Sequence, residues 1–320
     1  MKVQSSIIEN KYLRIKSINI GACLYEVFDK QKRINLILNL GPTKNYSSKN
    51  AQIWFSKKSE LFCKEPEIII ENPEIDVIVE TIGGKEFSRE LVTKALENGK
   101  HVITANKDLI AVYGKELTEI ARKNDRHLLF EAAVAGAIPV LRLLKDYLNV
   151  QDIQAMRGIL NGTTNYILSE MEEKSISFDN ALSQAQQKGF AEQDPTNDIK
   201  GFDARYKLII LTYLITGQWF SPEQITLEGI DHLELADFEY AERMGRKIKL
   251  IANLRLNKKS LQVYVLPLMI EKDDTLAKVS GSTNAITFNG KYSDNITLIG
   301  KGAGSLPTSS AIISDLKKVF

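Results

Sequence analysis

A strand, a helix and a second strand follow one another between residues 73 and 107, and this pattern restricts the possible folds more than any other feature. Residues 74–84 (E-I-D-V-I-V-E-T-I-G-G) are rich in β-branched residues and end in a glycine turn, which is typical of a strand buried in a parallel sheet. Residues 87–99 (F-S-R-E-L-V-T-K-A-L-E-N-G) have helical spacing and a glycine stop. Residues 100–107 (K-H-V-I-T-A-N-K) then predict another short strand. We therefore expect a βαβ unit and an α/β fold with a parallel sheet.

Polar residues follow both predicted strands at positions suited to ligand binding. Ligands of open α/β sheets bind outside the carboxyl ends of the strands. Thr81, Gly83 and Lys107 come after the apolar part of each strand, so we expect them to contact a bound molecule. For Lys107, the position alone is equally consistent with a solvated lysine that follows a strand.

The N-terminal segment carries an incomplete dinucleotide-binding pattern. Residues 14–28 (R-I-K-S-I-N-I-G-A-C-L-Y-E-V-F) are consistent with a strand, a turn and a helix, which is how a Rossmann domain begins. Of the three glycines in G-x-G-x-x-G only the middle one is present, as Gly21, because Asn19 and Leu24 occupy the other positions. Gly21 and Ala22 are the expected contacts of the dinucleotide. No acidic residue ends the next predicted strand, so NAD and NADP are not distinguished.

An acid-rich segment precedes a strongly apolar helix. Residues 189–207 (G-F-A-E-Q-D-P-T-N-D-I-K-G-F-D-A-R-Y-K) lead into L-I-I-L-T-Y-L-I, and Asn197 or Asp198 is placed to cap the new helix. Asp203 and Lys207 share one helix face because they are four residues apart. A lysine beside apolar turns is partly desolvated and can be tuned as a proton donor. The alternative is an ordinary surface ion pair.

Three more carboxylates crowd the loop before this helix. They belong to Glu192, Asp194 and Asp198. So many acids beside an apolar helix favour a site for a cationic group over a role in solubility alone.

Glu131 lies in an otherwise apolar run, residues 127–134 (H-L-L-F-E-A-A-V). An unpaired buried carboxylate is costly, so Glu131 needs either a cation or several backbone amides as partners. With the main-chain carbonyls of Val134, Gly136 and Ile138, it could form an all-oxygen site for a monovalent or hard cation. Satisfaction by backbone amides alone is the simpler alternative.

The second half of the chain predicts an α+β domain. Residues 156–171 (M-R-G-I-L-N-G-T-T-N-Y-I-L-S-E-M) indicate a strand, a glycine turn and a helix, in which Asn and Thr could hold a polar substrate. Thr163 or Thr164 could equally cap that helix. Alternating patterns predict antiparallel strands at 260–270, 284–290 and 295–300. The following glycine loop, which contains Gly302, leads into a helix and suits contact with an anion or a nicotinamide.

Composition excludes several functional classes. The 320 residues carry 42 basic and 40 acidic side chains, so the net charge of +2 gives no broad field for nucleic acid or membranes. No secretory h-region and no run of about eighteen apolar residues occurs, so we expect a soluble protein. The two cysteines, Cys23 and Cys63, suit a reducing compartment, either a bacterial cytoplasm or an organelle such as a plastid.

The motifs together resemble those of the homoserine dehydrogenases. The matching segments run in order from residue 73 to residue 320: V-E-T-I-G-G, G-K-H-V-I-T-A-N-K, F-E-A-A-V-A-G-A-I-P, G-I-L-N-G-T-T-N-Y-I-L, the acid-rich segment and G-K-G-A-G-S-L-P-T-S-S-A. The chain is similar to the short form, which lacks a C-terminal regulatory domain. The resemblance implies NAD(P)-dependent interconversion of aspartate 4-semialdehyde and L-homoserine, a step of threonine and methionine biosynthesis.

The resemblance also implies a domain plan. Residues 1–134, completed by 300–320, would form a Rossmann-like cofactor domain. Residues 135–299 would form a domain for substrate binding, catalysis and dimerisation, in a homodimer or a higher homo-oligomer.

Roles for individual residues follow from the same resemblance. Lys207 corresponds to the proton donor and Lys107 to a second active-site lysine. Substrate carboxylates match Glu192 and Asp203, with Asp198 close by in the motif. Gly189 and Gly302 match cofactor contacts, and Glu131, Val134, Gly136 and Ile138 match the positions of a sodium site.

The family pattern G-L-G-T-V-G is replaced by residues 19–24, and this departure supports a rival hypothesis. The rival is a catalytically weak or inactive relative that keeps the fold and acts as a binding or assembly partner. The intact Lys107, Asp203 and Lys207 favour an active enzyme.

Overall fold

The computed structural model describes residues 7–10, 13–18, 24–28, 33–34, 66–73, 75–257 and 260–319. The chain divides into two compact units. Unit 1 comprises Met1–Ala133 and Thr308–Phe320, and unit 2 comprises Val134–Pro307. The C-terminal segment therefore returns to the first unit.

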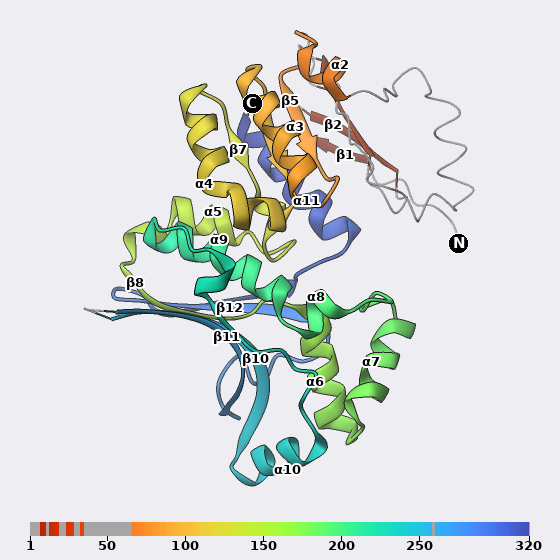
Figure 1. The fold of residues 1–320 in the computed structure, drawn as a ribbon, viewed down its shortest axis with the longest axis vertical. Coiled ribbons are helices and arrows are strands. Elements are labelled where there is room, and N and C mark those ends of the chain that lie inside the picture. The colour runs from red at the N-terminus through yellow and green to blue at the C-terminus, as the bar shows by residue number, and fades with distance from the viewer. Residues whose placement is uncertain are drawn as a thin grey trace. The chain divides into compact units, whose positions relative to one another are not determined.

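Unit 1 contains the predicted parallel sheet (Figure 1). Its strands are β5 (Val77–Glu80), β6 (His101–Thr104) and β7 (Leu128–Leu129), in that order, and both strand pairs are parallel. Helices α3 (Glu86–Glu97) and α4 (Lys107–Lys123) connect them, and α2 (Pro66–Glu71) precedes β5. The prediction of an α/β fold with a Rossmann-like parallel sheet is confirmed.

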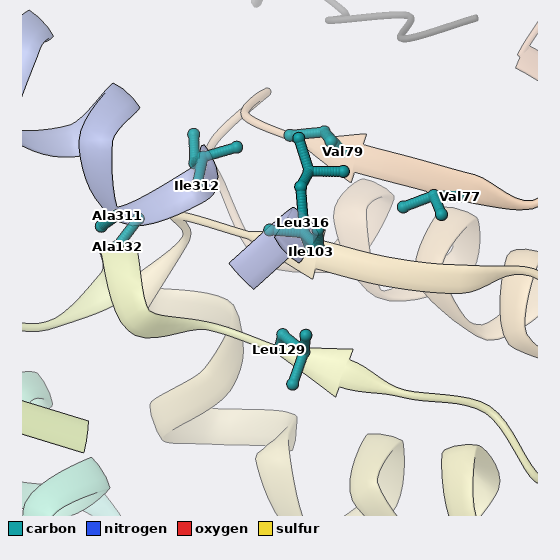
Figure 2. Packing of buried hydrophobic residues seen from close by; sticks show 8 residues of the cluster. All are labelled: Val77, Val79, Ile103, Leu129, Ala132, Ala311, Ile312 and Leu316. Atoms are coloured by element: carbon teal, nitrogen blue, oxygen red, sulfur yellow. The ribbon is translucent and has the colours of Figure 1, made fainter. Parts of the chain in front are cut away.

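Helix α11 (Ser305–Val319) completes the core of unit 1. Figure 2 shows apolar side chains of α11 packed against those of the three parallel strands and the turn that follows β7. The cluster consists of Val77, Val79, Ile103, Leu129, Ala132, Ala311, Ile312 and Leu316. Burial of this apolar surface from distant segments is what holds the C-terminal helix in unit 1.

The N-terminal strands differ from the prediction. An antiparallel sheet is formed in the order β1 (Ile7–Asn10), β2 (Leu13–Ile18), β3 (Leu24–Phe28), β4 (Arg33–Ile34). The helix expected after Gly21 is wrong, because Leu24 begins β3 and pairs with Ile18. The segment L-Y-E-V-F has aromatic and β-branched residues, which favour a strand. Most of the next predicted strand, residues 34–40 (I-N-L-I-L-N-L), lies outside the described residues.

Unit 2 is built on a six-stranded sheet in the order β13-β12-β8-β10-β11-β9. The strands are β8 (Ile153–Ile159), β9 (Thr226–Leu227), β10 (Arg246–Asn257), β11 (Ser260–Glu271), β12 (Thr283–Gly290) and β13 (Asp294–Lys301). All pairs are antiparallel except β9 with β11. The three strands predicted from alternation in this region are confirmed as β11, β12 and β13.

Helices of unit 2 pack against the central strand β10. Those in contact with it are α6 (Gly162–Lys174), α9 (Phe202–Thr216) and α10 (Leu235–Arg243). The other helices are α5 (Val140–Asp146), η3 (Leu148–Val150), α7 (Phe178–Gln187), α8 (Thr196–Ile199) and η4 (Pro222–Gln224). In the part of the chain that the structure describes, none of the helices is long and apolar enough to span a membrane.

Two predicted helix caps are wrong. The cap of α6 is Asn161, whose side chain accepts a hydrogen bond from the Thr164 amide, rather than Thr163 or Thr164. Asn197 and Asp198 lie inside the short helix α8. Helix α9 begins instead after Gly201, whose φ of 79° belongs to the left-handed region that glycine adopts readily.

Candidate active site

Lys207 and Asp203 form a buried ion pair on α9. Their residues are 7% and 8% exposed, and Lys207 Nζ lies 2.6 Å from Asp203 Oδ2. The same Nζ donates a second hydrogen bond, of 2.8 Å, to the carbonyl of Leu160. An ordinary surface pair is therefore the wrong interpretation, and the two donor contacts hold the lysine in one orientation.

Asn161 joins Asp203 to Asp198. Its Nδ2 donates to Asp198 Oδ1 at 2.6 Å and to Asp203 Oδ2 at 2.8 Å. Two of the three predicted substrate carboxylates are thus brought together, through a residue that the motifs did not single out. The available signal was its place just before a helix that begins G-T-T-N, where asparagine is a preferred cap.

Glu192 and Gly189 lie on the loop between α7 and α8. Glu192 is exposed, and its carbonyl accepts a hydrogen bond from Gln186. Gly189 ends α7 in the left-handed conformation, with φ 74°, and its amide donates to the carbonyl of Gln186. Helix termination therefore explains this glycine structurally. A Cβ atom added at Gly189 would meet no other atom within 4 Å, so its open Cα face leaves room for a ligand.

Gly302 lies directly against the side chain of Asn284. A Cβ atom at Gly302 would be 2.0 Å from Asn284 Nδ2, so only glycine fits here. That Nδ2 donates to the Leu160 carbonyl at 3.0 Å, which is the oxygen that Lys207 also uses. The Oδ1 of Asn284 is buried without a hydrogen-bond partner among the described residues. Gly302 is therefore required by packing, in addition to its predicted contact with a cofactor.

A buried lysine supports the first turn of α6. Lys249, on β10, is 1% exposed and donates to Asn165 Oδ1 at 3.2 Å and to the Val279 carbonyl at 2.8 Å. Burial lowers the pKa of Lys249 to about 8. Asn165 in turn donates to the carbonyls of Val279, Gly281 and Thr283, so this network holds the loop before β12 against α6.

In unit 1, Glu80 organises the glycine loop at the carboxyl end of β5. Glu80 is 3% exposed, and its Oε1 accepts from the amides of Ile82 and Gly83 at 2.8 and 3.2 Å. It also accepts from Ser88 and Thr104. We did not select Glu80 from the sequence, although a carboxylate that ends an apolar strand should need partners as much as Glu131 does.

The predicted ligand-contact residues of unit 1 surround this loop or follow β6. Thr81 is half-buried, and Gly83 has a φ of 82° with nothing within 4 Å of a Cβ position. Lys107 is the first residue of α4 rather than the end of a strand, and its Nζ lies 3.6 Å from Asp108 Oδ1. The Asn106 side chain caps this helix and donates to the Gly84 carbonyl, which ties the loop to the start of α4.

Glu131 lies in the turn η2 (Glu131–Ala133), rather than in the strand expected there, and is 6% exposed. Its amide donates to Asp315 of α11 at 2.8 Å. Val134, Gly136 and Ile138 begin unit 2. Left-handed φ angles of 58° at Ala135 and 54° at Gly136 turn the chain sharply at this point.

One of the carbonyl oxygens proposed as cation ligands already accepts a hydrogen bond. The Ile138 carbonyl accepts a hydrogen bond of 2.7 Å from Val140. Within the described ranges no cluster of three or more His, Cys, Asp or Glu side chains could hold a metal ion. Any cation here would therefore depend on carbonyl oxygens, which hard cations accept.

Gly21 and Ala22, the remaining predicted cofactor contacts, lie outside the described residues. Unit 2 thus contains a buried lysine and carboxylate with fixed partners. Unit 1, considered separately, contains an ordered glycine loop. A buried lysine held in a single orientation by a carboxylate can move a proton to or from a bound oxygen atom.

Comparison with known proteins identifies relatives of both units. Residues 139–316 match the family model described as homoserine dehydrogenase, and residues 19–131 match the model described as its NAD binding domain. The homoserine dehydrogenase of Neisseria gonorrhoeae is 42% identical over 258 residues, which cover 81% of this chain and 59% of that protein. The chain thus spans about three fifths of the length of this curated relative.

Solved structures agree with these matches. A homoserine dehydrogenase from Thiobacillus denitrificans superposes with a TM-score of 0.79 and 42% identity, covering 82% of this chain and 62% of that chain. A hyperthermophilic archaeal homoserine dehydrogenase in complex with NADPH gives a TM-score of 0.70 at 25% identity, covering 84% of this chain and 81% of that chain.

Proposed function

Because the chain belongs to the homoserine dehydrogenase family, we propose that it interconverts L-homoserine and L-aspartate 4-semialdehyde with NAD or NADP. The buried Asp203–Lys207 pair is the observation that supports this proposal most strongly. Burying a charged pair is costly in free energy, and a role in stability alone seldom repays it. A role in proton transfer to a substrate oxygen gives the pair a function.

Proton transfer is the task of Lys207 in this proposal. A bound nicotinamide supplies or accepts the hydride. Lys207 donates a proton to the aldehyde oxygen during reduction and takes it back during homoserine oxidation. Its ammonium is held by Asp203 and by the Leu160 carbonyl, so one donor position can face the substrate. Lys107, on unit 1, is proposed as the second lysine near the substrate.

Recognition of the substrate ammonium falls to carboxylates. Asp198, Asp203 and Glu192 offer negative charge on α8, α9 and the loop before them. An amino acid substrate carries a cationic group whose loss of hydration must be compensated by such partners. Asp198 and Asp203 are already linked by Asn161, which supports a shared role.

We propose a cofactor domain of residues 1–134 and 300–320, which includes all of unit 1, and a substrate domain of residues 135–299. Gly83 and Gly84 have left-handed φ angles and open Cα faces, so backbone can closely approach a bound dinucleotide. With Thr81 and Lys107 they would hold it at the carboxyl edge of the sheet. The proposal includes further contacts at Gly21, Ala22, Gly189 and Gly302.

A sodium ion is proposed at Glu131 with the carbonyls of Val134, Gly136 and Ile138. The donor set is entirely oxygen, and the carboxylate belongs to a residue that is 6% exposed. Hard cations with little charge prefer such ligands. The ion would neutralise Glu131 and brace the turn at Ala135 and Gly136.

Assembly as a homodimer or a higher homo-oligomer is proposed for unit 2. Ile299 on β13, at the edge of the sheet, is 55% exposed. Covering apolar surface of this kind with a second copy would remove it from water. Light scattering of the purified protein measures the mass directly, and a monomer at all concentrations would contradict this part of the proposal.

A nicotinamide absorbance assay tests the activity. We expect homoserine-dependent reduction of NAD or NADP, and no reduction when homoserine is omitted. Failure with both cofactors, in a protein that is folded and binds dinucleotide, would support the rival of an inactive relative. A comparison of kcat/KM for NAD and NADP then identifies the preferred cofactor.

A further inference from the structure

Asn161 is the point where three segments of unit 2 meet near the candidate site. Its side chain lies at the start of α6, and it contacts Asp198 on α8 and Asp203 on α9. The residue is 4% exposed. Resting on the proposed function, we infer that Asn161 is a positioning residue that holds Asp203, and through it Lys207, in the geometry needed for proton transfer.

Every polar atom of the Asn161 amide is committed. Its Nδ2 carries two hydrogens, and it donates to two carboxylates, Asp198 Oδ1 at 2.6 Å and Asp203 Oδ2 at 2.8 Å. Its Oδ1 accepts from the Thr164 amide at 2.8 Å. Rotating the amide by half a turn would place Oδ1 against two carboxylates and Nδ2 against an N–H group. The network therefore determines the orientation of this side chain.

The Asn161 side chain, which bridges Asp198 and Asp203, also fixes the position of Asp203, the carboxylate that pairs with Lys207. Oδ2 of Asp203 accepts from Asn161 and, at 2.6 Å, from Lys207. Without an amide between them, Asp198 and Asp203 would repel each other as like charges, and either could move or compete for the lysine. Removal of the bridge should thus displace the lysine from its position on the Leu160 carbonyl as well.

Capping and bridging are separable by substitution. Serine is as good a helix cap as asparagine but cannot reach across to two carboxylates, whereas alanine loses both functions. If Asn161 positions the ion pair, Asn161→Ser and Asn161→Ala should lose the same part of kcat, about 10- to 100-fold, since hydrogen bonds to charged groups are lost in both. Only Asn161→Ala should also lose the contribution of the cap to Tm.

A matched control is available on the neighbouring helix. The side chain of Ser177 caps α7 by accepting from the Asn180 amide. Ser177→Ala should lower Tm while leaving kcat unchanged. This control shows that the loss of a helix cap does not by itself impair the reaction.

A double-mutant cycle gives a measurement that a purely structural role would not affect. Asp198→Asn removes one charge and brings a new amide close to Asp203. We compare kcat values relative to the wild type. The relative kcat of the double variant Asn161→Ser with Asp198→Asn should exceed the product of the relative kcat values of the two single variants. The reason is that Asn161→Ser leaves Asp198 and Asp203 to repel each other, and Asp198→Asn removes that repulsion. Independent effects in the cycle would overturn the inference.

Kinetics with each substrate complete the test. We expect Asn161→Ser to lower kcat and raise KM for homoserine, with an unchanged KM for the dinucleotide. A wild-type kcat in Asn161→Ser would overturn the inference while leaving the proposed function intact. A wild-type protein that does not oxidise homoserine would instead remove the proposed function, so the two failures are distinguishable.

Discussion

At the residue scale, burial separates one helical ion pair from the others. Glu239 and Arg243 on α10 have the same four-residue spacing as Asp203 and Lys207, but their side chains are 69% and 77% exposed. Exposed pairs contribute little to stability because water and salt screen them. The buried pair cannot exchange its partners for water, so each of its contacts constrains the lysine.

Lys207→Ala should reduce kcat by about 10²- to 10⁴-fold, which is the usual contribution of a positioned acid or base. The reason is that no other group would donate a proton from this position. Steady-state assays in both directions measure the effect, with Arg243→Ala as the exposed control that keeps its kcat. A Lys207→Ala enzyme with wild-type kcat would exclude a central role for this lysine.

Gly302→Ala should lower thermal stability, because its Cβ would occupy the position of the Asn284 amide. Overpacking of this kind costs about 1–3 kcal/mol. The double variant Gly302→Ala with Asn284→Ala removes the clash, so its Tm should exceed that of Gly302→Ala alone. Calorimetric scans of the wild type, Gly302→Ala and the double variant measure the three Tm values. If the Tm of the double variant were no higher than that of Gly302→Ala, the clash with Asn284 would not be the cause of the lower stability.

At the scale of single elements, the N-terminal end of α6 depends on two buried polar groups. Asn161 caps its first turn, and Asn165, one turn later, is held by Lys249 of β10. A buried ammonium beneath a helix is unusual, because burial disfavours the charged form. The hydrogen bonds that the Lys249 ammonium donates to Asn165 Oδ1 and to the Val279 carbonyl partly offset this cost.

The pKa of Lys249, lowered by burial to about 8, predicts how stability depends on pH. The unfolded chain, with a lysine pKa near 10.5, binds more protons than the folded chain between pH 8 and 10.5, so this group makes stability rise with pH. From pH 7.5 to 9.5 the gain should be about 2 kcal/mol. Below pH 8 the folded protein carries a protonated Lys249, so the whole cost of burying this charge lowers the free energy of unfolding.

Urea titrations at pH 7.5 and 9.5 measure this gain as a difference between proteins. Lys249→Met should lack the rise that the wild type shows. The control Lys272→Met, which removes an exposed lysine paired with Glu242, should keep it. If the free energy of unfolding rose equally with pH in the wild type and in Lys249→Met, Lys249 would not be the cause of the rise.

At the scale of the whole molecule, the division into two units separates the proposed tasks. Lys107 and the glycine loop belong to unit 1, whereas Lys207 and its partners belong to unit 2. Helix α11 returns the chain to unit 1 after β13. The chain passes directly from unit 1 to unit 2 between Ala133 and Val134.

Glu131→Ala should lower Tm and abolish activation by monovalent cations, because it removes the only charged ligand of the proposed site. Glu131→Gln keeps the size of the side chain, so it should lose the cation response with a smaller fall in Tm. Activity and Tm titrated with sodium chloride, against an equal ionic strength of a large organic cation, provide the measurement. An unchanged sodium response in both variants would remove the cation from this site.

Local sequence patterns were sufficient for much of the fold. The β-branched run at 77–79, followed by glycines, predicted a parallel strand because such runs are stable when both faces are buried. Alternation predicted β11, β12 and β13, and helical spacing placed Asp203 beside Lys207. The N-terminal helix was wrong because a single glycine was interpreted through a motif whose other glycines are missing.

Only the tertiary structure determined what surrounds the site. Asn161 is 42 residues from Asp203, Leu160 is 47 from Lys207, and Asn284 is 124 from Leu160. Spacing within one helix determines which side chains share a face, but it carries no information about the segment that packs against that face. The free energy of burying polar groups decides those partners, because each must find a hydrogen bond wherever chain crossings bring donors and acceptors together.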